Sequence, residues 1–558
     1  MNLNYLVGRY RLAFIILLLV FAFYSFTLQP SLSWGDGTRL QREAITGESF
    51  ILAEMVNVEF APDPLPLAKV GVAAWDHPLY IALGHALVQL FPSIDSLWLV
   101  NIISALFGAA SIALLYLLCY SNTRSMVAAL IGAFSLAVSH TFWWHSVTPE
   151  VYTLFSFLLL LSLFFFDKYQ RGHLLNNLLI GSFILGLAVS DHLLALLALP
   201  SILLYYLFSM KTRQHYVIRY KPFLMAGLAF LAGFSFYAIQ FIRMLRTFPL
   251  SEIMGPVVGT PFLNSLIATT PQQILESLRT YVFFLLLQFN PLSLILAICG
   301  LWVGRKAYPL FWKKIIAFYV VYTLFGIFYR VSDQFAFFLS SYIFLAGVIS
   351  IGAAWSLSKI SQRKSKMVLV GGLVILIVVT PVFYQALPGI AHQVGFTDQS
   401  FNIPQIGIGL RDGLNYYVNP NKRGDYTAYQ FGYDTLISLP KEAVVVAHWY
   451  PDTDEYFILR YFQTVEHMRS DVEVIGWPKE DILNFDARTA VARINSEIQK
   501  HPLFLASLNE RYYAASELMK TYCIIPENNL YRLYKRDQIT SINEEKSCIV
   551  NSKVEVLP

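Results

Sequence analysis

Apolar runs of about the length that spans a bilayer recur along the first 390 residues of the chain. A helix needs about 20 mostly apolar residues to cross a membrane. About eleven stretches come close to this length, near residues 12–29, 97–119, 125–142, 151–166, 174–190, 192–209, 222–242, 281–303, 315–331, 334–356 and 367–387. The pattern predicts an α-helical polytopic membrane protein with about eleven transmembrane helices.

The pattern changes after about residue 390, where charged residues become more frequent and the apolar runs shorten. Runs of strand length at 444–447, 472–475 and 503–506 are separated by helix-like stretches at 454–468 and 488–500. This alternation is typical of a small α/β domain. We therefore predict a transmembrane domain over 1–390 and an α/β domain over 391–558. No glycine-rich phosphate-binding motif supports nucleotide binding there.

Basic and acidic residues fall in alternate connections between the apolar runs. One set holds Lys and Arg residues such as Arg124, Arg219, Arg305 and Lys364, whereas the other holds acids such as Asp36, Glu150, Asp191 and Asp333. By the positive-inside rule the basic side is cytoplasmic. The first loop, about 30–77, and the domain over 391–558 are therefore predicted to be extracytoplasmic. We expect a bacterial or archaeal cytoplasmic membrane, with the active face outside.

The composition agrees with a membrane location, because 56% of the 558 residues are hydrophobic and 14% are charged. An ordinary soluble domain has about a quarter charged residues. The net charge of +5 comes without a clustered basic surface, so no nucleic-acid partner is expected. The four Cys residues are too few and too scattered for a zinc ribbon. Cys523 and Cys548 remain candidates for one disulfide in an oxidising compartment.

Several ionisable residues lie where they could act on a substrate at the outer face. Asp36 follows the first apolar run between two glycines, where a carboxylate can serve as a general base or simply belong to a turn. Glu150 shares a short connection with His145, so it either binds substrate or caps the next helix. Asp191 and His192 separate two apolar runs, and Asp191 either faces a cavity or caps the following helix.

Arg330 and Asp333 are spaced as an i,i+3 pair that could close a helix end. Alternatively, Arg330 could bind a phosphate group, for which a guanidinium has a suitable shape. The Cys and His residues do not have metal-ligand spacing, and there is no Gly-x-Ser-x-Gly motif. We therefore expect neither a metal site nor a serine nucleophile.

A resemblance to one family rests on seven short motifs: Gly35-Asp36, Pro78-Leu-Tyr-Ile-Ala-Leu-Gly-His85, Asn101-Ile-Ile-Ser-Ala-Leu, Thr141-Phe-Trp143, Glu150-Val-Tyr152, Gly186-Leu with His192, and Val331-Ser-Asp-Gln-Phe-Ala-Phe-Phe338. In order and spacing they resemble the protein O-mannosyltransferase-like family of GT-C glycosyltransferases. The resemblance is close over roughly residues 10–360. It continues more weakly in 435–443 and 469–472.

The resemblance implies a multi-span enzyme that moves a sugar from a polyprenyl-phosphate carrier to an acceptor at the outer face. It also implies that Asp36, in the first outer loop, is the general base. The family pattern Asp-Ser-Gly-Glu-Leu is Asp36-Gly-Thr-Arg39-Leu here, so a second acid is replaced by a cation. The family's His-Pro-Pro-Gly-Tyr is replaced by Ala73-Ala-Trp-Asp-His77, which makes Asp76 and His77 candidates for substrate binding.

Direct displacement at an anomeric carbon needs a carboxylate to accept the acceptor's proton and cations to stabilise the departing phosphate. A single displacement inverts the sugar's configuration. Asp36 is the candidate base, and the candidate cations are Arg243, Arg246, Arg279, Arg330 and His192. The lipid-linked sugar donor is then a substrate, the acceptor is a protein, lipid or glycan, and no cofactor is expected.

Two alternatives stay open. A lipid-linked sugar transporter or flippase would also need many spans, although transporters commonly bind substrate near the bilayer midplane and the polar residues here collect at one face. The second alternative is an inactive, membrane-anchored assembly module. It stays open because Arg39 stands where the family has an acid.

Overall fold

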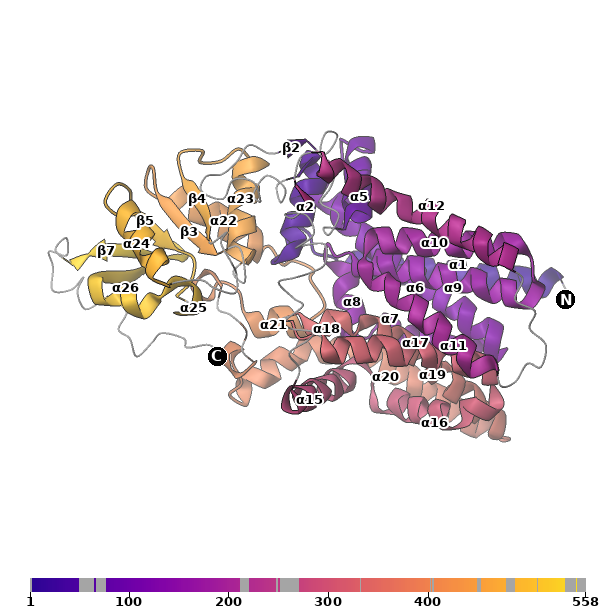
Figure 1. Cartoon of the computed structure of the whole chain (residues 1–558). Coiled ribbons are helices and arrows are strands. Elements are labelled where there is room, and N and C mark those ends of the chain that lie inside the picture. The colour runs from indigo at the N-terminus through magenta and orange to yellow at the C-terminus, as the bar shows by residue number, and fades with distance from the viewer. Residues whose placement is uncertain are drawn as a thin grey trace.

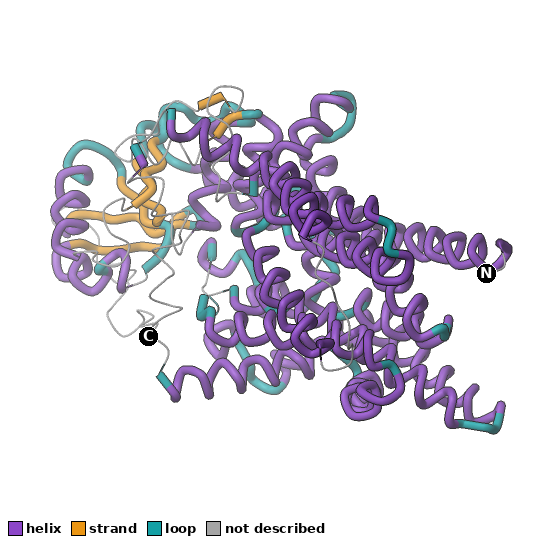
Figure 2. The backbone as a smooth tube through the Cα atoms, turned by 45° about the vertical axis from the view of Figure 1, so that its right-hand side comes forward, coloured by secondary structure: helices purple, strands orange, loops and turns teal. Residues whose placement is uncertain are grey.

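The computed structural model describes most of the chain, namely residues 3–49, 65–66, 77–210, 220–246, 249–250, 270–331, 333–401, 403, 406–448, 453–477, 487–508, 510–536 and 548. A helical bundle makes up the larger part, and a sheet flanked by helices lies at one end of it (Figure 1). Figure 2 shows the strands in orange at that end, with the N-terminus at the opposite end of the molecule.

Seven helices in the described residues are long and apolar enough to cross a membrane: α1 (Leu3–Phe26), α6 (Ser96–Thr123), α9 (Tyr152–Gly172), α12 (Tyr220–Leu245), α17 (Pro309–Phe328), α19 (Leu339–Lys359) and α20 (Arg363–Gln393). Two bent pairs raise this number to nine. One joins α7 (Met126–Ala137) to α8 (His140–Val147) at 64°, and the other joins α15 (Pro271–Gln288) to α16 (Pro291–Ala307) at 116°. The predicted helical membrane fold is confirmed.

Besides the bent α7–α8 pair, three predicted spans differ from one straight helix of membrane length. The run near 174–190 forms α10 (Leu175–Asp191), and the run near 192–209 forms a short 3-10 helix, η1 (Leu193–Leu197), followed by α11 (Ala198–Met210). The span predicted near 281–303 is wrong as a single helix. Pro291 lacks a backbone N–H and starts α16, while the Asn290 side chain accepts a hydrogen bond from the N–H of Ser293.

Glycines allow several of the bundle helices to pack closely. Gly186 on α10 and Gly233 on α12 face each other's backbone, as do Gly300 on α16 and Gly352 on α19. A Cβ atom at any of these positions would meet main-chain atoms of the neighbouring helix. Small residues at such crossings let transmembrane helices approach closely, which strengthens van der Waals packing where the hydrophobic effect is weak.

The sheet contains five strands in the order β4-β3-β5-β7-β6. The strands β3 (Val444–His448), β4 (Glu473–Trp477) and β5 (Leu503–Leu505) are parallel and agree with the three predicted runs. An unpredicted antiparallel pair, β6 (Tyr522–Glu527) and β7 (Leu530–Lys535), extends the sheet beyond β5. The sheet and its helices confirm a small C-terminal α/β part, whereas the boundary at residue 390 stays a prediction.

Helices cover both faces of the sheet. The helices α22 (Thr427–Ser438) and α23 (Thr453–Thr464) share one core with Val445, Ala447 and Phe504. The helices α24 (Ala487–Glu497) and α26 (Ala515–Thr521) share another with Val444, Val446 and Leu503. This division follows from the alternation of side chains along a strand. Shorter helices in this half are α21 (Gly413–Val418) and α25 (Glu510–Tyr513).

Cys523 on β6 and Cys548 form a disulfide, as the sequence suggested. The bond closes a loop over a sequence separation of 25. Cross-linking of this kind stabilises a fold mainly by restricting the unfolded chain.

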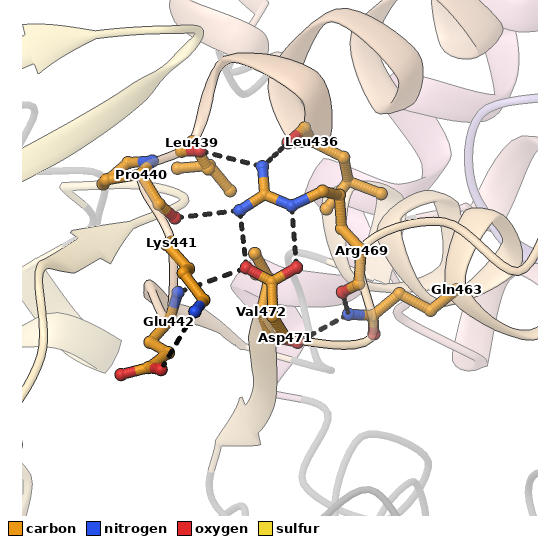
Figure 3. Close-up of polar contacts among 9 residues, drawn as sticks. All are labelled: Leu436, Leu439, Pro440, Lys441, Glu442, Gln463, Arg469, Asp471 and Val472. Atoms are coloured by element: carbon orange, nitrogen blue, oxygen red, sulfur yellow. Dashed lines mark hydrogen bonds and ion pairs between the residues drawn. The ribbon is translucent and has the colours of Figure 1, made fainter.

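Arg469 joins the end of α22 to the loop before β4 (Figure 3). Its guanidinium donates to the carbonyls of Leu436, Leu439 and Pro440 at 2.6, 2.8 and 2.9 Å, and it binds the Asp471 carboxylate with two bonds of 2.8 and 2.9 Å. Hydrogen bonds from Arg469 hold the pKa of Asp471 below its usual range. The two segments with the weaker family resemblance, 435–443 and 469–472, are therefore held together by one side chain.

Replacement of Arg469 by Lys should destabilise the α/β part by about 1–3 kcal/mol, because an ammonium cannot reproduce the planar fork. The pKa of Asp471 is lowered on folding, so this stabilisation is present above the ordinary Asp pKa and is lost as the pH falls through the lowered value. Thermal unfolding in detergent at neutral and acidic pH measures the effect. Lys520→Gln, which removes an exposed pair with Glu517, is the control and should change stability by less than about 0.5 kcal/mol. Equal midpoints for Arg469→Lys and wild type would contradict the expectation.

Candidate functional site

Asp36 is the first residue of α2 (Asp36–Thr46), a short helix at the end of the bundle that faces the sheet (Figure 1). Gly35 before it has φ 77° and ψ −151°, a conformation that favours glycine. The Asp36 side chain is 62% exposed, and its Oδ2 lies 3.8 Å from Nη2 of Arg39. The carboxylate is therefore accessible to a substrate, and the cation that replaces the family's second acid lies beside it.

Buried amides fix the chain just before Asp36. Asn101 on α6 donates from Nδ2 to the carbonyls of Gln29 and Ser31 at 2.9 and 3.0 Å. Gln41 on α2 donates from Nε2 to Asn101 Oδ1 at 2.7 Å and to the Ser31 carbonyl at 3.2 Å. The motif that begins at Asn101 thus positions the segment that carries the candidate base.

The structure places Glu150 and Asp333 near enough to Asp36 for its charge to act on both carboxyl groups. Glu150 lies between α8 and α9, where its backbone N–H donates to Ser104 Oγ at 3.1 Å. Burial raises the pKa of Glu150 well above its usual value, and the charges of Asp36 and Asp333 raise it further. Asp333, before the short helix α18 (Gln334–Phe337), is accessible to solvent but closely surrounded by protein. Burial and the charge of Asp36 raise its pKa to about 6.

Three predicted histidines form a row of rings with Tyr152. The ring of His77 lies 4.8 Å from that of His192, which lies 5.3 Å from Tyr152, and Tyr152 lies 4.8 Å from His145. His192 Nδ1 accepts the backbone N–H of Leu194 at 3.0 Å, which fits a neutral ring and argues against the cationic role considered for it. Burial, with a smaller effect of Arg39, lowers the pKa of His77 to about 4. His77 and His192 are therefore expected to be uncharged members of this row.

Asp191 does not cap the following helix, contrary to one of the two interpretations of the sequence. His192 is the capping residue of η1, because its side chain accepts the N–H of Leu194. Asp191 is 2% exposed, and both of its carboxyl oxygens are buried with no hydrogen-bond partner among the described residues. Its backbone carbonyl lies 3.1 Å from His77 Nδ1.

Arg330 does not pair with Asp333, so the i,i+3 interpretation is wrong. Its Nη2 lies 3.1 Å from Oε2 of Glu276 on α15, and its side chain stays 33% exposed. Arg279, also on α15, lies on an exposed, mainly apolar face of that helix with Leu278, Val282, Phe283 and Leu286. Arg243 and Arg246 lie at the end of α12. Asp76 lies outside the described residues.

The sequence did not identify two C-terminal residues that lie against the Asp36 loop. Asp454, in the first turn of α23, contacts Gly35, and Arg411 forms an ion pair with Asp454. No motif signals either residue, because the contacts that bring them to the Asp36 loop, Arg411 with Trp34 and Asp454 with Gly35, join positions more than 370 residues apart. The site therefore draws on both parts of the chain.

Comparison with known proteins finds one matching family model, over part of the chain, and solved structures with a similar fold. Residues 76–215 match the model of the "Protein O-mannosyl-transferase TMEM260 N-terminal domain". ArnT from Cupriavidus metallidurans in the apo state aligns with a TM-score of 0.53 and 12% identity, over 95% of this chain and 97% of that chain. The same protein bound to undecaprenyl phosphate aligns with a TM-score of 0.51 and 11% identity, over 96% and 98%. Among curated protein sequences, none matches the chain significantly.

At such identities the likeness to ArnT shows the fold alone. The family model supports the resemblance found in the motifs over its own range, which contains His77, His145, Glu150, Asp191 and His192. Asp36 and Asp333 lie outside that range. Their proximity to Glu150 comes from the structure.

Proposed function

Because the family model and the fold support a membrane glycosyltransferase of the GT-C type, we propose that the chain transfers a sugar from a polyprenyl-phosphate donor to a hydroxyl acceptor with inversion. The acceptor is a protein, lipid or glycan at the extracytoplasmic face. One observation carries the proposal: an exposed carboxylate, Asp36, lies at the sheet-facing end of the bundle, where its charge acts on the carboxyl groups of Glu150 and Asp333. The donor class is suggested by the ArnT structure bound to undecaprenyl phosphate.

In the proposed reaction, Asp36 accepts the proton of the acceptor hydroxyl while that oxygen attacks the anomeric carbon. The bond between that carbon and the phosphate oxygen breaks at the same time, and polyprenyl phosphate leaves with the electron pair. The negative charge that develops on the phosphate needs a cation. Arg330 is suited to this role because its guanidinium remains partly exposed beside the segment that carries Asp333.

Glu150 is proposed to bind a sugar hydroxyl in its protonated form. Burial and two neighbouring carboxylates raise its pKa well above the usual value, which favours the protonated form that can donate a hydrogen bond. Glu150→Gln keeps a donor of the same shape and should retain transfer within about threefold, whereas Glu150→Ala should lose roughly tenfold. Steady-state transfer rates of the two variants test this. Equal losses of transfer rate in Glu150→Gln and Glu150→Ala would show instead that the ionised carboxylate is needed.

The function is tested with purified protein in lipid nanodiscs and isotope-labelled polyprenyl-phosphate sugars. Label is followed into lipid, glycan and protein fractions, and the anomeric configuration of the product is read by NMR. We expect label in one acceptor fraction, with the configuration opposite to that of the donor. Retained configuration would contradict a single displacement. Movement of intact donor across a vesicle bilayer without transfer would favour a transporter.

A further inference from the structure

The chain just before Asp36 is attached to the C-terminal α/β part. Trp34 is 3% exposed and donates from Nε1 to Thr427 Oγ1 at 2.8 Å. Its ring lies 5.6 Å from that of Phe431 on α22. Leu32, Trp34 and Trp144 belong to the same buried core as the strand residues Val445 and Ala447. The two parts therefore share one core at the Asp36 loop.

A second contact reaches the residue next to Asp36. The carboxyl group of Asp454 lies near the backbone N–H of Gly35, which favours the ionised form of that carboxyl. A Cβ atom on Gly35 would lie 3.2 Å from Asp454 Oδ1, so this carboxyl lies directly against the glycine. Figure 1 shows α23, which carries Asp454, next to α2. Phe457 of α23 also contacts α2, since the guanidinium groups of Arg39 and Arg42 lie 6.0 and 5.8 Å from its ring.

Asp454 is itself held in place. Nη1 of Arg411 lies 3.4 Å from Asp454 Oδ2, and the two side chains are 1% and 12% exposed. The rings of Trp34, Tyr416 and Tyr417 surround the Arg411 guanidinium at 5.5, 5.4 and 5.3 Å. A buried ion pair is weak evidence for stability. It does hold its two side chains in place, because separating them would leave a buried charge without its partner. Catalytic groups need such support to stay within about 0.5 Å of a productive position.

From these contacts we propose that Asp454, held by Arg411, is a positioning residue for Asp36. The α/β part would then complete the active site of the membrane part rather than only serve as a separate outer module. Asp454 acts through the backbone of Gly35 and does not touch the reacting atoms. The inference rests on the proposed function, because it takes Asp36 as the base.

The test combines Asp454→Ala with Asp36→Asn in a double-mutant cycle. A displacement of about 1 Å costs roughly a hundredfold in rate, so Asp454→Ala should lower kcat by about thirty- to a hundredfold and leave KM for the donor within about twofold. Asp454→Asn keeps a side chain of the same shape and an oxygen beside Gly35, and it should lose less. Because Asp454 acts through Asp36, Asp454→Ala should cause no further loss in the Asp36→Asn background. The control Glu517→Gln, at an exposed pair on α26, should behave as wild type.

Two outcomes would overturn the positioning role. One is a wild-type kcat in Asp454→Ala, and the other is an equal factor of loss in kcat from Asp454→Ala in the wild-type and Asp36→Asn backgrounds. If Asp454→Ala does not accumulate, Asp454→Asn replaces it in the cycle, and hydrogen exchange over residues 33–38 reports whether the loop loosens. Wild-type activity in Asp36→Asn would refute the assignment of Asp36 as the base, on which the inference rests. A strongly impaired Asp36→Asn variant, in which Asp454→Ala lowers kcat by the same further factor as in wild type, would refute only the inference.

Discussion

Replacement of Asp36 by Asn is expected to lower the rate of sugar transfer by about two to four orders of magnitude, the usual contribution of a positioned general base. The amide has the same shape as the carboxylate, so the Gly35 conformation, α2 and donor binding should be preserved. What is lost is the group that accepts the proton. Transfer rates and donor affinity, measured on the same preparation, separate chemistry from binding.

Asp95→Asn is the matched control for this variant. Asp95 is another exposed acid at the start of a helix, where its Oδ1 accepts the N–H of Trp98 at 2.7 Å, and Asn caps a helix as well as Asp does. It should keep wild-type activity. Full turnover in Asp36→Asn, with loss in Asp76→Asn or Glu150→Gln, would move the base to one of those residues. Full turnover in all three variants would refute the mechanism.

Replacement of Gly35 by Ala should lower kcat by about a hundredfold. A Cβ atom is strained at φ 77° and ψ −151°, and it would also press on Asp454 Oδ1 from 3.2 Å. Both effects displace the backbone that carries Asp36. The measurement is kcat and donor KM, and the expected signature is a loss in kcat with little change in KM.

Gly395→Ala is the control, because Gly395 also has a positive φ of 89° but has nothing within 4 Å of its Cβ position. It imposes backbone strain away from the site and should leave kcat within about twofold of wild type. Equal losses in the two variants would mean that strain alone, rather than the placement of Asp36, explains the effect. Unchanged kcat in Gly35→Ala would show that the loop tolerates the displacement.

The helices were predictable because membrane spans depend on length and apolarity, which one sequence displays directly. Each of the eleven apolar runs corresponds to helical structure, and the three buried strands also agree. The 116° break before Pro291 was overlooked, although the Asn290-Pro291 pair is a recognisable helix start. The antiparallel pair β6 and β7 was also missed, because both strands mix apolar with polar and charged residues.

The site was predictable only where its residues lie in short motifs. Asp36, Glu150 and Asp333 were named from local patterns, and the structure adds that they interact. Pairings over long sequence distances could not be read from one chain. Arg330 pairs with Glu276, 54 positions away, and Arg411 with Asp454, 43 positions away. The contact between Asp454 and Gly35 spans most of the chain.

The most direct measurement of the central claim is the stoichiometry of the reaction in purified protein. Wild-type protein in nanodiscs is given a polyprenyl-phosphate sugar and its acceptor, and released polyprenyl phosphate and transferred sugar are quantified together. The account predicts equimolar amounts that increase in parallel, and a rate about a hundredfold or more lower in Asp36→Asn. Release of polyprenyl phosphate without transfer, or equal rates in wild type and Asp36→Asn, would contradict it.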